Sequence, residues 1–144
     1  DGYFDYVVPP LEGLWYTQDG EKFTYADKQK LCWISMIRLP DFVKKYDFDW
    51  AIEQATAKKN IDFSAVEYFE YDEGLCAQCM HIGSYDDEPM TIDKIESFAL
   101  SQGYEPYFGD GRMHHEIYLS DPRKVSPDKL KTVIRIPIAK KEQV

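Results

Sequence analysis

Alternating hydrophobic and polar positions predict a strand over residues 113–120, which read Met-His-His-Glu-Ile-Tyr-Leu-Ser. Successive side chains of a strand point to opposite faces of its sheet, so Ile117 and Leu119 share one face and Glu116 and Tyr118 share the other. The face with Ile117 is typical of a core. The opposite face places a glutamate where a sheet carries either a solvated charge or a group that faces a ligand. The function depends on which of these two environments holds Glu116.

Five further segments are rich in β-branched and aromatic residues, which are typical of strands. They are residues 3–16, 31–39, 63–71, 75–82 and 130–139. Pro9 and Pro10 interrupt the first segment, and because proline donates no backbone hydrogen bond, they predict an edge strand or a bulge near Gly13. The polar residues 17–30 predict a loop between the first two strands. Residues 72–74, Asp-Glu-Gly, predict a hairpin turn that joins the third and fourth segments.

Two segments have helical patterns. Residues 41–59 form the first, with Asp47 or Asp49 as its N-cap. A second helix begins at Thr91, carries an apolar stripe and ends at Gly103. The stripe consists of Ile92, Ile95, Phe98, Ala99 and Leu100. An apolar stripe of this kind predicts a helix that packs on a sheet.

A short pattern occurs twice in the chain. Residues 36–40 read Met-Ile-Arg-Leu-Pro and residues 133–137 read Val-Ile-Arg-Ile-Pro, and each ends the second strand of a candidate strand pair. Agreement in place within a larger unit indicates an internal repeat. We therefore expect an α+β fold of two pseudo-symmetric β-α-β-β repeats that form a curved antiparallel sheet.

The repeat also predicts how the chain is organised. We expect residues 1–144 to be one domain, in which residues 1–40 are the end of the first repeat, residues 41–60 a linker helix and residues 61–139 the second repeat. The first repeat lacks its first strand and helix in this chain, so the domain is expected to be incomplete at its N-terminal side.

Composition limits the classes of partner. The 144 residues include 26 acidic and 17 basic side chains, for a net charge of −9, and 15% are aromatic. Nucleic-acid binding depends on Lys and Arg, so the acidic balance argues against nucleic acid and anionic membranes. Aromatic faces in an acidic chain suit flat or cationic organic ligands. No apolar run approaches the ~20 residues of a membrane helix and no secretory leader is evident, so we expect a cytoplasmic protein.

The cysteines and histidines do not predict a metal site. Cys76 and Cys79 form a C-x-x-C pattern, but a strand sends the two sulfurs to opposite faces and no second pair exists. His114 and His115 are adjacent and face opposite ways for the same reason, and the third histidine, His81, is distant in sequence. We interpret all three histidines as structural and expect no metal and no cofactor.

Three stretches carry a family resemblance. They are residues 10–15 (Pro-Leu-Glu-Gly-Leu-Trp), residues 74–83 (Gly-Leu-Cys through His-Ile-Gly) and residues 114–123 (His-His-Glu-Ile-Tyr-Leu-Ser-Asp-Pro-Arg). Over nearly its whole length the chain resembles the stand-alone branch of the GyrI-like small-molecule-binding domains. This fold is shared with the effector-binding halves of multidrug-responsive transcription regulators.

The resemblance implies a cleft between the two repeats that takes amphipathic, often aromatic and cationic, compounds. The buried cleft glutamate of the family falls on Glu116, and Tyr118, Trp15 and Tyr16 would supply aromatic walls. Some members of the stand-alone branch hydrolyse the cyclopropane ring of DNA-alkylating natural products. The resemblance implies no cofactor for that activity.

Two functions therefore remain open. A small-molecule-binding protein needs only a carboxylate in an aromatic cleft, because burial strengthens its attraction for a cation. A cofactor-free hydrolase would use the same groups as catalytic residues, with Glu116 activating a water and Tyr118 donating to the developing oxyanion. A sensor half of a regulator is a third interpretation, and it requires a DNA-binding domain outside this chain.

Overall fold

The structure, a computed structural model, describes residues 6–17 and 28–141. Within these residues the fold is α+β, with an open antiparallel sheet of six strands and two α-helices. The chain divides into two compact units, Asp1–Ile37 with Glu73–Val144 and Arg38–Asp72. The sheet lies in the first unit, which also contains the candidate site.

The strand order in the sheet is β2-β1-β5-β6-β3, and β4 pairs with β6. The strands are β1 (Leu11–Thr17), β2 (Leu31–Ile37), β3 (Cys76–Ile82), β4 (Tyr104–Pro106), β5 (His114–Tyr118) and β6 (Lys131–Lys140). Every pairing is antiparallel. Two strand pairs distant in sequence, β1–β2 and β5–β6, therefore meet through the β1–β5 pairing.

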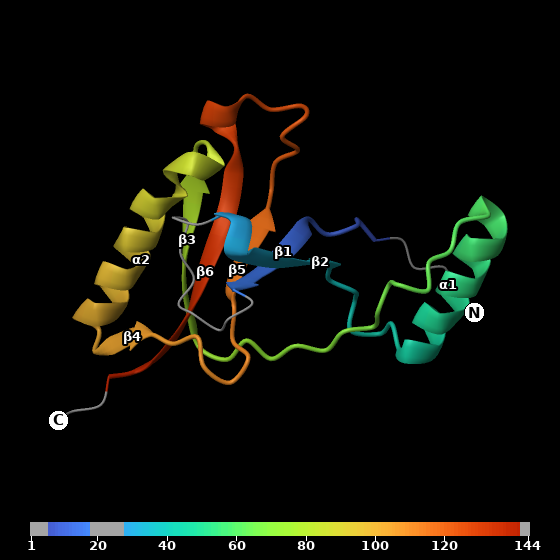
Figure 1. Cartoon of the computed structure of the whole chain (residues 1–144), viewed down its shortest axis with the longest axis horizontal. Coiled ribbons are helices and arrows are strands. Elements are labelled where there is room, and N and C mark those ends of the chain that lie inside the picture. Colours follow the sequence, from blue (N-terminus) through green and yellow to red (C-terminus); the bar gives the residue numbers. More distant parts are fainter. Residues whose placement is uncertain (1–5, 18–27, 142–144) are drawn as a thin grey trace. The chain divides into compact units, whose positions relative to one another are not determined.

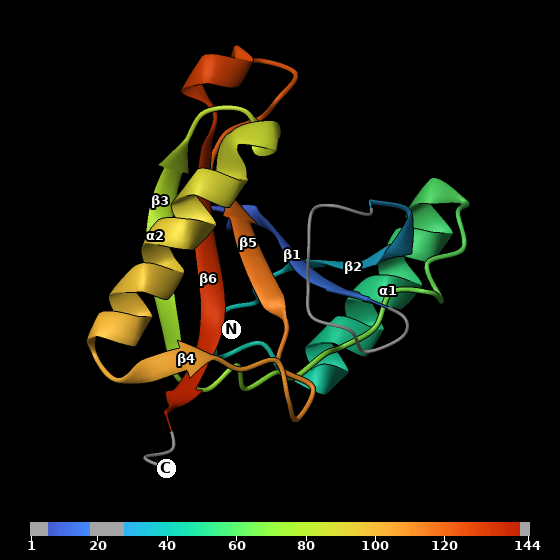
Figure 2. The same ribbon diagram turned by 60° about the vertical axis from the view of Figure 1, so that its left-hand side comes forward.

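Helix α2 (Glu88–Ser101) packs on one face of β3 and β6 (Figure 1). The helix runs along these two strands at one side of the sheet (Figure 2). Three residues of the predicted apolar stripe supply the contact, because Ile95 and Ala99 are buried in the core with β6 and Ile92 packs against it. The other two, Phe98 and Leu100, are 62% and 51% exposed, so the stripe was predicted too wide. The strand side of this core consists of Ala77, Ile134, Ile136 and Ile138. Since β5 pairs with β6, this core also fixes the position of β5 in the sheet.

The smaller unit contains helix α1 (Lys45–Lys59), which has no buried residue. Asp47 accepts a hydrogen bond from the backbone nitrogen of Lys44 at 2.9 Å, so it lies inside the first turn instead of at the N-cap. Asn60 closes the helix in the left-handed conformation with φ 53°. The rings of Phe48 and Tyr68 lie 5.7 Å apart and hold the following segment against the helix.

Several elements differ from the sequence prediction. Residues 63–71 form no strand, and the predicted hairpin with residues 75–82 is wrong, because β3 pairs with β6 instead. The aromatic side chains of that segment pack locally, as Phe69 does on Tyr71 with ring centroids 5.8 Å apart. Residues 6–10 are also not strand, whereas residues 3–5 and most of the predicted loop at 17–30 lie outside the described residues.

Helix α2 begins three residues before the predicted Thr91, with Pro89 in its first turn. Proline is favourable there because the first turn of a helix has unused N–H groups. The first residue of the helix is Glu88, and this shift in the start brings a carboxylate to the sheet that the sequence interpretation did not consider.

Candidate functional site

A cleft of about 1140 Å³ opens beside α2, on the face of the sheet that the helix partly covers. Pairing of Glu116 with Ile134 puts both side chains on this face, and Ile134 belongs to the core under α2. Four aromatic residues line the cleft, and most of its other walls are aliphatic. The aromatic residues are Trp15, Trp33, Tyr85 and Tyr118, and the acidic ones are Glu88, Glu116 and Asp121.

Glu116 is 4% exposed and accepts hydrogen bonds at both of its carboxylate oxygens. The hydroxyl of Tyr118 donates to Oε2 over 2.7 Å, and Nε2 of His114 lies 2.9 Å from Oε1. A carboxylate accepts only, so these contacts require His114 to carry its proton on Nε2. Tyr118 and His114 therefore satisfy both carboxylate oxygens of Glu116 by hydrogen bonds.

Tyr118 connects Glu116 to the aromatic wall. Its hydroxyl accepts a hydrogen bond from Nε1 of Trp15 at 2.9 Å while it donates to Glu116. Burial and the Glu116 carboxylate raise the pKa of Tyr118 far above its usual value of 10.0. The phenol therefore keeps its proton well above the pH at which an ordinary tyrosine ionises, and it remains a donor.

The aromatic rings pack closely around this chain of hydrogen bonds. Trp15 stacks on Trp33 with centroids 5.7 Å apart and planes 20° apart, and Tyr85 meets Tyr118 edge-on at 6.1 Å. Gly13 lies across from Glu116 in the pairing of β1 with β5. A Cβ at Gly13 would collide with the indole nitrogen of Trp33, so glycine is required there for the two tryptophans to stack.

Carboxylates give the cleft a negative potential. Glu88 is 1% exposed at the start of α2 and lines the same cleft as Glu116. Burial raises the pKa of Tyr85, and the charges of Glu88, Glu116 and Asp121 raise it further. Arg123 at the cleft holds Asp121 through hydrogen bonds of 2.9 Å to both of its oxygens, which lower the pKa of Asp121 to about 2.

The arrangement can attract and hold an organic cation. Aromatic faces and buried carboxylates both stabilise positive charge in a setting from which water is partly excluded. The same groups can act on a neutral electrophile, since Glu116 is a proton acceptor and Tyr118 a donor within 2.7 Å of each other.

The structure brings three of the four predicted site residues together, namely Glu116, Tyr118 and Trp15. It does not bring Tyr16 to the cleft. Side chains alternate along β1, so Tyr16 lies on the opposite face of the sheet from Trp15, where it is 38% exposed.

Sequence reasoning missed Glu88, Tyr85 and Trp33. Trp33 pairs directly with Trp15 across β1 and β2, so it shares the face of Trp15. Correct pairing of the two predicted strands would have found it. Glu88 is the first residue of α2, four residues before Ile92, and Tyr85 lies in the short 3-10 turn Tyr85–Asp87 before the helix. The sequence signal for both residues was the acidic and aromatic segment that leads into α2, the helix that packs beside Glu116.

The remaining candidates have structural contacts. His81 is 4% exposed, with Nδ1 2.9 Å from the hydroxyl of Thr91 and Nε2 2.9 Å from the carbonyl oxygen of Ser84. Cys76 and Cys79 are free thiols on β3. Within residues 6–17 and 28–141, no group of three or more His, Cys, Asp or Glu side chains is arranged to hold a metal ion. In the same residues, no helix has the length and apolar character needed to cross a membrane.

Solved structures similar to this chain come from Listeria innocua. One, an uncharacterized conserved protein, is 43% identical with a TM-score of 0.87, and the match covers 96% of this chain and 67% of that protein. A hydrolase is 40% identical with a TM-score of 0.82 and coverage of 96% and 66%. Another hydrolase structure is 42% identical with a TM-score of 0.83 and coverage of 96% and 67%. The chain thus spans about two thirds of the length of these proteins.

No curated protein matches the chain significantly. The sequence profile of one family does match, over residues 3–139, and that family is described as the GyrI-like small molecule binding domain. This match covers nearly the whole chain and agrees with the fold of the similar structures. The chain belongs to the GyrI-like small molecule binding domain family.

Proposed function

We propose that the protein binds an amphipathic organic cation with a flat aromatic part in the cleft beside α2. The observation that carries this proposal is the burial of two carboxylates, Glu88 and Glu116, within an aromatic cleft. The rings of Trp15 and Tyr118 contact the flat part of the ligand, and the carboxylate of Glu116 pairs with its positive charge. Membership of a small-molecule-binding family supports the same function.

A cationic dye tests the proposal. Rhodamine 6G keeps its positive charge over a wide pH range, and its binding is followed by fluorescence anisotropy. We expect saturable binding to the wild type and a dissociation constant about tenfold or more higher for Glu116→Gln, because contacts to a charged group contribute about 1.5–3 kcal/mol. Fluorescein has a related ring system but negative charge, and it should bind much more weakly.

Asp93→Asn is the matched control. Asp93 is an exposed residue of α2 that does not line the cleft, so this variant removes one negative charge without changing the site. Equal weakening by Asp93→Asn and Glu116→Gln would mean that net charge alone attracts the dye, and the proposal would fail. Glu88→Gln should weaken binding as well, which would assign the second carboxylate to the same ligand.

A second candidate function is a cofactor-free hydrolase of cyclopropane-containing alkylating compounds. The similarity to two Listeria innocua hydrolase structures at 40% and 42% identity favours it. In this reaction Glu116 accepts a proton from water, and the water oxygen attacks a cyclopropane carbon. The strained C–C bond breaks, and its electron pair moves to a conjugated carbonyl oxygen, which Tyr118 stabilises by donating a hydrogen bond.

Chromatography separates the two candidates. The protein is incubated with a cyclopropane-containing alkylating compound, and ring-opened product is measured beside a Glu116→Gln control. Product that is lost in the control would establish hydrolysis. Unchanged compound together with saturable binding would leave binding as the function.

We further propose that residues 1–144 form one GyrI-like domain containing parts of two equivalent β-α-β-β repeats. Residues 1–40 then hold the end of the first repeat, residues 41–60 a linker helix and residues 61–139 the second repeat. The antiparallel contact of β1–β2 with β5–β6 through β1 and β5 supports this organisation. A crystal structure in which β1–β2 fails to superpose on β5–β6 by a twofold rotation would contradict it.

A further inference from the structure

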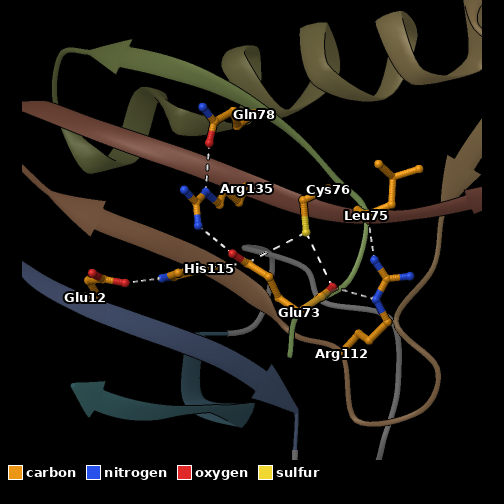
Figure 3. A network of polar contacts seen from close by, with 8 residues as sticks. All are labelled: Glu12, Glu73, Leu75, Cys76, Gln78, Arg112, His115 and Arg135. Atoms are coloured by element: carbon orange, nitrogen blue, oxygen red, sulfur yellow. Dashed lines mark hydrogen bonds and ion pairs between the residues drawn. The ribbon is translucent and has the colours of Figure 1, made fainter. Parts of the chain in front are cut away.

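A second buried charge cluster lies on the face of the sheet opposite the cleft (Figure 3). Its centre is His115, which is 3% exposed and adjacent to Glu116 in β5. Nε2 of His115 lies 2.8 Å from Glu12 Oε2, and Nδ1 lies 2.9 Å from Glu73 Oε2. Because ionised carboxylates only accept hydrogen bonds, both ring nitrogens must donate, which makes the ring an imidazolium.

Charged and polar groups from several elements complete this cluster. Arg135 of β6 pairs with His115 in the sheet and binds the other oxygen of Glu73. Arg135 also donates from Nε to Gln78 of β3 over 2.8 Å. Arg112 donates to the backbone oxygen of Glu73 at 2.9 Å and so fixes the segment that carries this carboxylate. The carboxylates of Glu12 and Glu73 are paired with the cations His115 and Arg135, and Arg112 adds a third positive charge.

The cluster spans the junction between β1 and β5. Glu12 belongs to β1 and His115 to β5, and their hydrogen bond joins the two strands on the back of the sheet. On the cleft face the same strands supply Trp15 and Tyr118, which are joined by the 2.9 Å hydrogen bond between them. The two walls of the cleft therefore depend on one strand junction that is held from both faces.

We propose that protonated His115 is a positioning residue for the cleft: it holds β1 against β5 from the back of the sheet, so that ligand affinity falls when His115 loses its proton. This inference rests on the proposed ligand binding. Loss of the proton leaves a nitrogen lone pair facing a carboxylate, which weakens one of the two hydrogen bonds and loosens the junction.

The titration falls at mildly alkaline pH. Burial lowers the pKa of His115, but the hydrogen bonds to Glu12 and Glu73 and the charges of both carboxylates raise it to about 9. The charged groups in contact with the ring are Glu12 from β1 and Glu73 from the segment before β3, with Arg135 of β6 beside Glu73. Tyr118 does not titrate in this range, because its own pKa is raised.

Two measurements on the whole chain test the proposal. NMR follows the imidazole signals of His115 with pH, and anisotropy gives the affinity for rhodamine 6G over the same range. We expect constant affinity in neutral solution and a decrease of about fivefold or more above the His115 midpoint, as is typical of coupling between two sites. Coupling is reciprocal, so saturating dye should raise the measured pKa of His115.

Glu12→Gln is the decisive variant, because Glu12 does not line the cleft. Loss of this carboxylate should lower the His115 midpoint by about one pH unit or more and move the midpoint of dye affinity with it. His115→Gln should remove the pH dependence. Glu105→Gln, which changes an exposed carboxylate of β4, is the charge control and should move neither midpoint.

Each failure has its own signature. Affinity that stays flat while His115 titrates at alkaline pH would overturn the positioning role and leave ligand binding intact. A His115 midpoint near 6.5, the ordinary value, would overturn it as well. Absence of dye binding at every pH would overturn the proposed function, and this inference with it.

Discussion

Glu116 and His115 are neighbours on β5, yet their side chains lie on opposite faces of the sheet and meet different surroundings. Each is less than 5% exposed, at 4% and 3%. On the back face His115 lies between two carboxylates, and Arg135 balances the second charge. On the cleft face Glu116 accepts hydrogen bonds from Tyr118 and His114 and shares an aromatic cleft with Glu88.

The difference indicates what each face is for. A buried charge is costly unless it is paired, and removal of one partner of a buried pair costs more than the pair contributes. Charges on the back face are paired within the protein, which stabilises the sheet. In the cleft, Glu88 and Glu116 lie among aromatic rings, and such a setting favours a ligand with a positive charge. Substitutions on the back face should therefore lower stability, and those in the cleft should lower affinity.

The largest expected effect on stability follows from Glu73→Ala. This substitution removes the acceptor of both His115 and Arg135. We expect the free energy of unfolding to fall by about 2–3 kcal/mol, less than for a fully buried pair because water reaches part of the Arg135 side chain. Urea unfolding measures the change. Glu73→Gln keeps one acceptor oxygen and should lose less; equal stability of wild type and Glu73→Ala would contradict the comparison.

The pH dependence of stability is expected to be the next effect in size. His115 has a folded pKa of about 9 against 6.5 unfolded, so its contribution is complete below pH 6.5 and is lost as the pH rises through 9. The hydrogen bond from His115 and the charges of His115 and Arg135 lower the pKa of Glu73 from 4.5 despite burial, so that contribution is lost as the pH falls below 4.5.

Stability should therefore be highest between about pH 4.5 and 6.5 and decline by about 1–2 kcal/mol toward pH 9. Thermal unfolding of wild type and His115→Gln over this range measures the decline. The variant should lack the alkaline part of it. A parallel decline in both proteins would assign the pH dependence to other groups.

Tyr118→Phe should have a smaller effect, and on both properties. It removes the donor to Glu116 and the acceptor of Trp15, so we expect about 1 kcal/mol lower stability and severalfold weaker binding of rhodamine 6G. Tyr16→Phe is the matched control, because it removes the same hydroxyl from the opposite face of the sheet. Weaker binding by Tyr16→Phe would place part of the ligand site on the back face.

Local patterns predicted the parts of the fold that depend on local contacts. Local patterns predicted β5 as a strand and α2 as a helix, since each pattern repeats within a few residues. They did not predict the faces correctly, because the core lies on the face of Glu116 and Ile134 instead of that of Ile117. The strand predicted at 63–71 was wrong, because aromatic composition does not reveal which segments find a pairing partner. β3 pairs with β6, which lies far along the chain.

The same limit applies to the site. Glu116 and Tyr118 share a face by alternation alone, whereas the choice between Trp15 and Tyr16 needs the register of β1 against β5. The partners of His115 are 103 and 42 residues away in sequence. No short pattern could identify such contacts, so the histidines were interpreted as structural without their partners.

The smallest expected effect is that of Glu116→Gln on stability. The amide oxygen still accepts from Tyr118, and the amide nitrogen can donate to His114 in its other tautomer, so no buried polar group loses its partner. The substitution also removes a negative charge from a cleft that holds Glu88 and Asp121. We expect the free energy of unfolding to be within about 0.5 kcal/mol of wild type, or slightly higher, although ligand affinity is lost.

Urea unfolding of Glu116→Gln and Glu73→Ala under the same conditions compares the two faces of the sheet directly. If Glu116→Gln lowers the free energy of unfolding as much as Glu73→Ala does, Glu116 is a structural charge like those on the back face. The cleft would then not be preorganised to bind a cation.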